Sequence, residues 1–588
     1  MSYIVIPGFK GGAADSLYDP IENQTYQTAK DLDVFSYKNI LTPYSIFSNV
    51  TLPTVSGGTE VKILNIYYAS DGNYYIIGTA TIAGLNNLVL WSTPSSGTTL
   101  GASPTYTTVI TAVSSSPSAE LEEFKDYLYF GFGTTLKKLT TTATAVTFTV
   151  TVATPAVFTS TGHGFEAGDA VKFSTTGALP TGLTAGTIYY VIGAGLTADA
   201  FEVAATVGGA AINTTGTQSG THTIVMSTKT VSSILTSLGV IRSHEGLGKI
   251  FFANGNAVGS YDGTTLSLTA LTLNSNENIV GLEPFGKFLI PGVNDDNSSK
   301  KSRFLLWDGS STTLDDIIYT GDTGLKAFRV IGNEIRAIFS DTLGFRQYAF
   351  NIGSKPESNI SIPLTVTSGG TTINGNAVES AKDLTIFGLD GYTYSIDSLL
   401  WAYGSGNAKT KDFLTQFRTI AAGTVSAIGF VAIKDFNGQT IIIYRTSSGA
   451  TPVMEATKIS TTLSANGVYE SNAFPLKKGL PGKIKRIIIN HKPIPATTGF
   501  LVQIKHYGHY PWGSSVPAED SFVNLTTPEG SGSSTGKTQS TDNATMTEIT
   551  GNELFKTARF VQLKIKFDEI NEATAPTILF PIIIEVED

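Results

Sequence analysis

The residues best suited to chemistry in this sequence are three histidines near its C-terminal end, His491, His506 and His509. Imidazole nitrogens are common zinc ligands, usually in sets completed by other imidazoles, thiolates or carboxylates. Side chains three positions apart on a strand point to opposite faces, so His506 and His509 could share one ion only across a bend. No carboxylate is suitably spaced beside them. We therefore predict packing or surface histidines and no metal site.

The carboxylates could serve calcium binding or acid–base catalysis at three places, and each has a simpler interpretation. Asp295-Asp296-Asn297 and Asp435-Phe436-Asn437-Gly438 offer oxygen ligands but lack the spacing of a calcium loop, so we predict hairpin tips. Asp315 and Asp316 are adjacent, and neighbouring residues on a strand face opposite ways. We predict no enzymatic activity and no cofactor. A carbohydrate-active propeller enzyme, with carboxylates gathered from distant strands, stays an alternative.

A second apparent motif lies at Gly530–Thr538, where Gly536-Lys537-Thr538 resembles the end of a nucleotide phosphate-binding loop. That loop requires a glycine five residues before its Gly-Lys, with a strand before the motif and a helix after it. Ser531 occupies the glycine position, and the surrounding segment is rich in serine and glycine. We predict an ordinary surface loop here.

Aromatic side chains offer a different chemistry, because their faces stack on sugars. Tyr507, Tyr510 and Trp512 cluster near a predicted loop and are our candidates for surface aromatic contacts. The other tryptophans lie in or beside apolar runs, and we predict that they anchor the core or the corners of strands.

Composition narrows the class of protein. The 588 residues include no cysteine, which excludes disulfides, thiolate metal sites and cysteine nucleophiles. The net charge is −9, with no basic stripe of the kind that follows a nucleic-acid backbone. The first residues lack the basic and apolar regions of a signal peptide, and no apolar stretch approaches about 18 residues, so we expect neither a signal peptide nor a membrane span.

Short apolar runs recur along most of the chain, and several are preceded or followed by an Asp-Gly corner. Charged residues make up only 15% of the sequence, as is typical of proteins built from strands and turns. Because glycine accepts positive φ, Asp-Gly between apolar runs predicts a type I′ hairpin. The runs are 74–78, 127–131, 249–253, 287–290, 335–339, 384–388 and 430–433, and the corners are Ser70-Asp71-Gly72, Tyr261-Asp262-Gly263, Trp307-Asp308-Gly309 and Leu389-Asp390-Gly391.

The spacing of these runs predicts an all-β protein with an irregular β-propeller of about seven blades, because steps of roughly 35–55 residues match one blade each. One step, from Phe130 to Phe252, is far too long. Removing residues 144–228 shortens this step to the length of one blade. We therefore predict that this segment is an inserted small β-barrel or sandwich. The propeller then comprises residues 51–143 and 229–465. A β-sandwich array is the alternative.

The two ends of the chain differ from the repeats. Residues 466–588 contain alternating strands such as Val561–Phe567, which predict a C-terminal β-sandwich with one buried face. Residues 1–50 are rich in turn residues and form an N-terminal arm. We consider two roles for the arm: a strand that closes the first domain, or an extension that grips a neighbouring subunit.

The inserted segment resembles a small β-module of tailed-bacteriophage structural proteins. The resemblance rests on Gly177–Val191, on the upstream Gly162–Asp169 and on the downstream Gly208–Gly216. More loosely, the propeller and the C-terminal segment around Ile484–Ile487 resemble phage tail proteins. In short-tailed phages the tail nozzle is a hexameric ring of propellers with inserted β-domains. The resemblance implies this fold and assembly, and it carries over no binding residues.

Our first functional hypothesis is therefore a structural protein of the virion tail, a nozzle-like ring that lines or closes the DNA ejection channel. It implies a homo-oligomer, expected to be a hexamer, contacts with other tail or portal and adaptor proteins, and passage of viral DNA without sequence-specific binding. Synthesis would occur in the host cytoplasm. The alternative is a receptor-binding or adhesion protein of the tail that recognises a host surface glycan.

Overall fold

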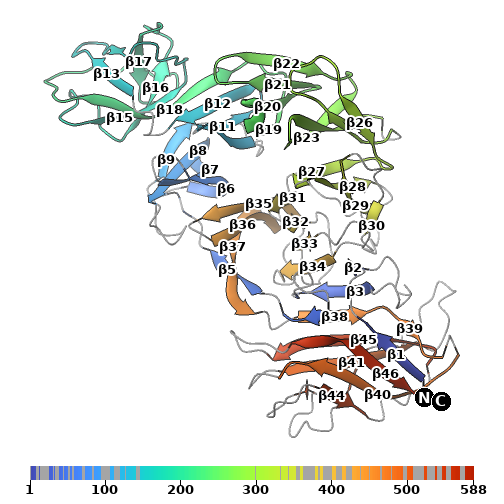
Figure 1. Cartoon of the computed structure of the whole chain (residues 1–588). Coiled ribbons are helices and arrows are strands. Elements are labelled where there is room, and N and C mark those ends of the chain that lie inside the picture. Colours follow the sequence, from blue (N-terminus) through green and yellow to red (C-terminus); the bar gives the residue numbers. More distant parts are fainter. Residues whose placement is uncertain are drawn as a thin grey trace.

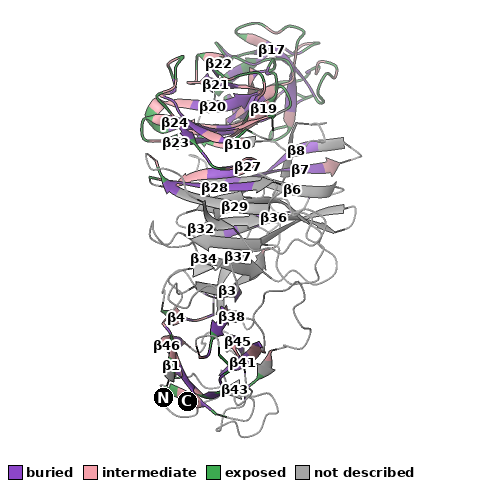
Figure 2. Cartoon of the chain, turned by 90° about the vertical axis from the view of Figure 1, so that its right-hand side faces the viewer, coloured by how far each residue is buried: buried purple, intermediate pink, exposed green. Residues whose placement is uncertain are grey.

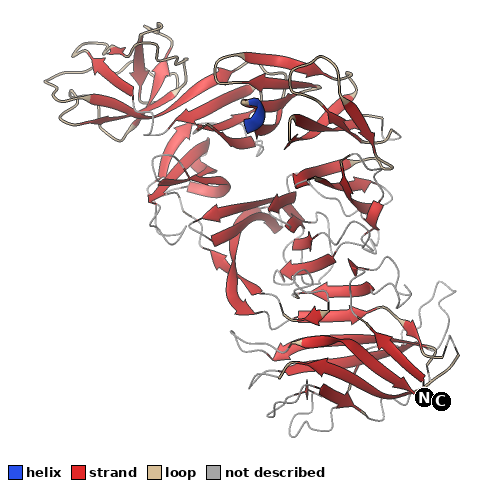
Figure 3. Cartoon of the chain, viewed as in Figure 1, coloured by secondary structure: helices blue, strands red, loops and turns tan. Residues whose placement is uncertain are grey.

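The computed structural model is built almost entirely of strands, which confirms the all-β prediction (Figure 3). It describes residues 120–352 apart from 126, 141–145, 298–299, 332 and 342–343, most of residues 467–507 and 558–587, and shorter stretches elsewhere. Among these residues the one helical element is a single 3₁₀ turn, η3 (Glu245–Leu247). No helix in the described part is long and apolar enough to span a membrane.

The repeated apolar runs lie in antiparallel sheets that follow one another along the chain, and all but the last run fall in the second strand of a sheet. The first three sheets are β6 (Gly58–Tyr68), β7 (Asn73–Ile82), β8 (Leu85–Pro94) and β9 (Tyr106–Ile110); β10 (Glu120–Phe124), β11 (Tyr127–Phe132), β12 (Thr135–Thr140) and part of β18 (His222–Ser232); and β19 (Leu238–His244), β20 (Lys249–Asn254), β21 (Ala257–Tyr261) and β22 (Leu266–Thr272).

The remaining sheets of this series continue in the same order. They are β23 (Glu277–Phe285), β24 (Phe288–Asp295), β25 (Arg303–Leu306) and β26 (Asp316–Tyr319); β27 (Leu325–Ile331), β28 (Glu334–Asp341), β29 (Gly344–Asn351) and β30 (Ser358–Ser361); β31 (Val378–Ala381), β32 (Leu384–Gly388), β33 (Leu400–Gly404) and β34 (Phe413–Arg418); and β35 (Ala427–Phe436), β36 (Gln439–Ser448), β37 (Thr451–Leu463) and β5 (Ser45–Val50).

The sheets are arranged around a common axis as a β-propeller (Figure 1). The first strands contact one another in a closed order, β6 to β10, β19, β23, β27, β31, β35 and back to β6. Strand β5 closes the circle, because it precedes the first sheet in sequence yet pairs with β37 of the last, with Val50 opposite Ala456. The last propeller sheet thus combines a strand that precedes the first sheet with three strands from the end of the propeller sequence.

Apolar clusters fill the spaces between neighbouring sheets. In β7, Ile77 packs toward the second sheet and Ile76 packs toward the last sheet, so both faces of the strand are buried. Phe251 of β20 meets Trp307 of the fourth sheet edge-on at 5.7 Å, and both side chains are fully buried. Burial on two faces explains why these strands are continuous apolar runs instead of alternating ones (Figure 2).

The segment between β12 and β18 forms a closed barrel. Its strands are β13 (Val146–Val150), β14 (Phe158–Thr159), β15 (Ala170–Thr175), β16 (Ile188–Ile192) and β17 (Ala200–Ala204), and the N-terminal half of β18 pairs with both β13 and β15 to close it. Stacked rings fill its interior: Phe158 lies 5.1 Å from Phe173 and 5.2 Å from Phe201. Of the two predicted forms, barrel or sandwich, the structure has the barrel.

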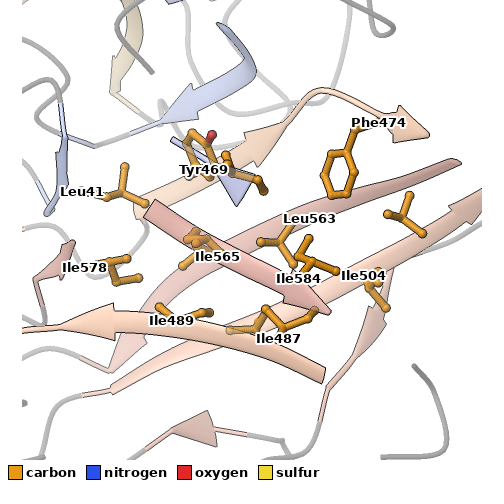
Figure 4. Packing of buried hydrophobic residues seen from close by; sticks show 14 of the residues in the cluster. Leu41, Tyr469, Phe474, Ile487, Ile489, Ile504, Leu563, Ile565, Ile578 and Ile584 are labelled. Atoms are coloured by element: carbon orange, nitrogen blue, oxygen red, sulfur yellow. The ribbon is translucent and has the colours of Figure 1, made fainter. Parts of the chain in front are cut away.

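The C-terminal residues form two facing sheets around a large apolar core (Figure 4). One sheet contains β40 (Ile484–His491), β44 (Met546–Ile549) and β46 (Ile578–Val586), and the other contains β38 (Gly467–Ser471), β41 (Gly499–Tyr507), β42 (Val523–Asn524) and β45 (Phe560–Glu569). Alternate residues of β45, such as Leu563 and Ile565, point into this core, as the period-two pattern predicts.

The N-terminal strands belong to this C-terminal unit. Strands β1 (Ser2–Ile6) and β4 (Ile40–Leu41) pair with β46, and β3 (Thr25–Lys30) pairs with β38. Strand β3 also pairs with β34, with Lys30 opposite Gln416, so the sixth propeller sheet continues into this unit. Strand β5 closes the propeller, which is the first of the two roles predicted for the arm, whereas β1, β3 and β4 complete the sandwich at the far end of the sequence. Contact of the arm with a neighbouring subunit stays a prediction. The sequence does not reveal this, because the pairing joins residues more than 400 positions apart.

A substitution at Gly259 tests how closely side chains pack between paired strands of the propeller. It lies directly opposite Phe252, and a Cβ at this position would stand 2.2 Å from the Phe252 ring. We predict that Gly259→Ala lowers the free energy of unfolding by about 1–3 kcal/mol, since the buried ring must move. The measurement is chemical denaturation followed by tryptophan fluorescence. Gly193→Ala, where the nearest atom would be 3.8 Å away, is the matched control. Equal stability of the two variants would contradict the prediction.

Candidate functional site

The joint between the barrel and the propeller is the most highly organised polar site in the described residues. Strand β18 crosses it without a break: Ile224 pairs with Val146 in the barrel, while Lys229 and Thr230 pair with Lys138 and Lys137 of β12 in the second propeller sheet. One hydrogen-bonded strand is therefore shared by two cores. Such a connection transmits orientation directly, because bending it would break ladder hydrogen bonds.

A buried ion pair reinforces the joint. Lys137 Nζ lies 2.8 Å from Asp169 Oδ1, and the two side chains are 10% and 0% exposed. Thr230 Oγ1 accepts from Lys137 at 2.8 Å and donates to Asp169 Oδ1 at 3.0 Å. The second carboxylate oxygen accepts from the backbone N–H of Glu166 at 2.8 Å. With both oxygens and the ammonium satisfied, the pair acts as an anchor and has no free group for acid–base chemistry.

The position of Asp169 at this joint explains why the Gly162–Asp169 segment has the residues it has. Gly168 has φ +88°, which a side chain would strain, and this turn brings Asp169 to the joint. His163 is buried in the same turn, where its Nδ1 accepts from the N–H of Phe165 at 3.0 Å and its ring stacks on Phe165. The most distinctive residues of the insert thus serve the attachment of the barrel.

Among the described residues, a groove on the barrel is the candidate for binding a ligand. Its volume is about 860 Å³, and it is lined by residues 146–150, 159–161 and 218–222. Its polar side chains are fixed: His222 pairs with Thr175 Oγ1 at 2.8 Å and with Gln218 Oε1 at 3.0 Å, and Gln218 Nε2 donates to Val150 O at 2.7 Å. A wall of serine, threonine and amide groups suits hydrogen bonding to hydroxyl-rich ligands.

A chain of ion pairs links the first strands of four successive propeller sheets. Arg242 of β19 lies 3.9 Å from Glu122 of β10 and 3.2 Å from Glu283 of β23, and Arg329 of β27 lies 3.3 Å from Glu283. All four side chains are mostly buried. These carboxylates hold neighbouring sheets together, and sequence reasoning missed them because their partners are about 40 or more residues apart.

The predicted surface aromatic residues are not brought together. Tyr507, at the end of β41, is 7% exposed and its hydroxyl pairs with Gln562 Oε1 at 2.8 Å. It packs with Ala473 and Phe560, so Tyr507 is a core residue and its predicted surface position is wrong. Tyr510 and Trp512 lie outside the described residues.

The histidines and aspartates also take structural roles where they are described. His491 is buried and pairs with Thr547 Oγ1 at 2.9 Å. Asp295 accepts from Lys300 Nζ and Asn276 Nδ2, each at 2.9 Å, and Asp296 accepts from Asn278. His509 lies outside the described residues, as does Ser531, whereas Lys537 and Thr538 form the short strand β43 (Lys537–Thr538). The described residues contain no group of side chains that could hold a metal ion.

The Asp-Gly corners differ from the type I′ prediction. Gly263 and Gly309 have positive φ, at +108° and +76°, whereas the aspartates before them do not. Asp262 Oδ1 instead accepts from the N–H groups of Thr264 at 2.8 Å and Thr265 at 2.7 Å, which stabilises a longer turn between β21 and β22. Asp308 does the same before β26. The corners at Asp71 and Asp390 lie outside the described residues.

The anchor pair gives the first prediction of this site. Asp169→Asn leaves the buried Lys137 ammonium without a counter-charge, and we expect it to lower the stability of the barrel by about 3–5 kcal/mol. Hydrogen exchange of the β15 and β18 amides measures this loss. The double variant Lys137→Met, Asp169→Asn removes both charges and keeps a side-chain oxygen for the donors Glu166 N–H and Thr230 Oγ1, so it should lose less than Asp169→Asn alone. A double variant that is less stable than Asp169→Asn would contradict the anchor role.

The corner at Asp262 predicts a pH dependence. Hydrogen bonds from the N–H groups of Thr265 and Thr264 lower the pKa of Asp262 from 3.8 to about 2. Because the folded pKa is the lower one, the stabilisation is present above about pH 4 and is lost as the pH falls toward 2. Carboxyl NMR titration should give this low pKa, and Thr264→Ala, which removes the hydroxyl donor, should raise it. An unchanged pKa in that variant would contradict the assignment.

Comparison with known proteins gives similarity of architecture only. No model of a protein family matches the sequence, and no curated protein matches it. Among solved structures, the "Dos1 propeller" is 9% identical over 75% of this chain and 94% of its own, with a TM-score of 0.38. The "WD40 beta propeller domain of Doa1" is 9% identical over 71% of this chain and 97% of its own, with a TM-score of 0.32. Similarity this low carries no function over to this chain.

Proposed function

We propose that this chain is a structural component of a bacteriophage tail, a nozzle-like ring subunit that lines or closes the DNA ejection channel. The observation that carries the proposal is the rigidly mounted barrel: strand β18 and the buried Lys137–Asp169 pair fix it to the propeller. The residues of that barrel are also those that resemble the phage β-module. A rigid projecting domain suits a protein whose work is assembly and load bearing.

Within this proposal, the seven sheets are the blades of one propeller, which comprises residues 51–143 and 229–465. The arm is residues 1–50, the insert is residues 144–228, and the sandwich is residues 466–588. The closed order of contacts between first strands supports seven blades. Strand β5, at the end of the arm segment, joins the propeller, and β1, β3 and β4 join the sandwich. These strands of the arm thus tie distant parts of one subunit together.

The role that we propose is mechanical and involves no catalysis. Subunits would associate as a hexamer in the virion tail and would contact other tail, portal or adaptor proteins. DNA would pass along the axis of the hexamer without sequence-specific binding. The net charge of −9 suits this passage, because an acidic protein as a whole attracts DNA only weakly.

An exposed apolar strand offers one surface for contact between subunits. In the described part of its sheet, β1 has a single neighbouring strand on one side, and Tyr3 and Val5 on this strand are 52% and 43% exposed. An edge strand with outward apolar side chains is a common place for another chain to add.

The groove on the barrel favours a second candidate function, adhesion to a host surface glycan. Its lining carries serine and threonine hydroxyls, which suit hydrogen bonding to sugars, and His222 and Gln218 hold this wall in place through bonds within the barrel. In this case the barrel would be a receptor-binding module on the tail. Thr149→Ala and Thr161→Ala, at exposed positions of the lining, should then abolish binding on a glycan array without loss of fold.

The test of the first proposal is the stoichiometry and position of the protein. Mass photometry of the isolated chain should show a hexamer, and cryo-electron microscopy of the particle should show a six-fold ring coaxial with a DNA channel. A peripheral trimer, or a stable monomer that binds glycans through the groove, would overturn the nozzle role and favour adhesion.

A further inference from the structure

Two lysines lie side by side at the corner where the barrel meets the propeller. Lys138 of β12 and Lys229 of β18 are direct partners in the antiparallel pairing. Their neighbours Lys137 and Thr230 are on the opposite face, where they meet Asp169. The same pair of strands thus presents a neutralised lysine on one face and two lysines together on the other.

Three parts of the molecule surround these two ammonium groups. Lys138 Nζ lies 4.9 Å from the ring centre of Tyr127 in the second sheet and 5.6 Å from that of Tyr261 in the third. Lys229 Nζ lies 5.2 Å from the ring centre of Phe165 in the barrel. Aromatic faces stabilise cations, and these three rings fix both side chains at the corner.

The two lysines have no carboxylate within ion-pair distance among the described residues. Within the described part of the chain, neither Lys138 nor Lys229 forms an ion pair, and the nearby Asp169 is already bonded to Lys137. Burial lowers the pKa of Lys138, and the neighbouring Lys229 lowers it further. Burial also lowers the pKa of Lys229, against the opposing effect of Asp169.

Like charges placed directly opposite each other in a sheet are destabilising. The surrounding contacts therefore hold two half-buried ammonium groups in an arrangement that a bound anion would stabilise. A tetrahedral oxyanion fits this need, because its oxygens accept charge-assisted hydrogen bonds from ammonium groups. A hydrophobic ligand or a metal cation would gain nothing from the site.

We propose that Lys138 and Lys229 form a binding site for a phosphate oxyanion at the junction of the barrel and the second and third propeller sheets. The phosphate could belong to a free ion or to a nucleic-acid backbone, and both present the same oxygens. Binding at this corner would tie the barrel more firmly to the propeller. The inference does not depend on the proposed tail function, because the site lies within one chain.

Isothermal titration of the full chain with inorganic phosphate, at constant ionic strength and pH 7, tests the site. We expect binding that Lys138→Met and Lys229→Met each weaken at least about tenfold. Lys229→Arg, which keeps the charge, should retain most of the affinity. Lys172→Met is the matched control, since Lys172 is another half-buried lysine whose pKa burial lowers, and its pairing partners are Ile188 and Met226.

A short single-stranded oligonucleotide serves as the second probe. Binding of inorganic phosphate alone supports a free-ion site, and loss of oligonucleotide binding in the same two variants supports a backbone phosphate. Circular dichroism of each variant confirms that it is folded. Absence of phosphate binding to the wild-type chain, or equal loss in Lys172→Met, would overturn the proposal.

Discussion

Closure of the propeller is the constraint on which the rest of the chain depends. A single four-stranded sheet with two apolar faces is not stable in water, so each sheet needs a neighbour on both sides. Strand β5 meets this need at the last position, because it pairs with β37 while the chain continues directly into the first sheet at β6. The free energy of every inter-sheet cluster therefore depends on one pairing between distant parts of the sequence.

Electrostatics then fixes parts that apolar packing alone would leave free to slide. The chain of Glu122, Arg242, Glu283 and Arg329 ties successive first strands, and Lys137 with Asp169 ties the barrel to the second sheet. A mostly buried charged side chain must stay beside its partner, because separating the two costs on the order of 3–5 kcal/mol. These pairs specify how sheets and barrel are placed, while the apolar clusters provide most of the stability.

Much of the fold could be predicted from the sequence, but the site could not. Runs such as Tyr74–Gly78 and Tyr127–Gly131 predicted strands correctly, since two-sided burial leaves a continuous apolar pattern. The long step between Phe130 and Phe252 likewise predicted a separate β-unit in between, which is the barrel. The predicted surface position of Tyr507 was wrong, because the sequence pattern at the end of a strand does not show whether an aromatic ring points into the core or toward solvent.

The sequence by itself determined the strand content, the repeated unit and the position of a separate β-unit along the chain, because these follow from local periodicity and from glycine-rich turns. Tertiary structure alone decided which strands closed the propeller, where β1, β3 and β4 paired, and which lysine met a carboxylate. Lys137 and Lys138 are neighbours of the same type, yet one is neutralised by Asp169 and the other faces Lys229. The physical reason is that adjacent residues of a strand point to opposite faces, and only the folded chain shows what each face meets.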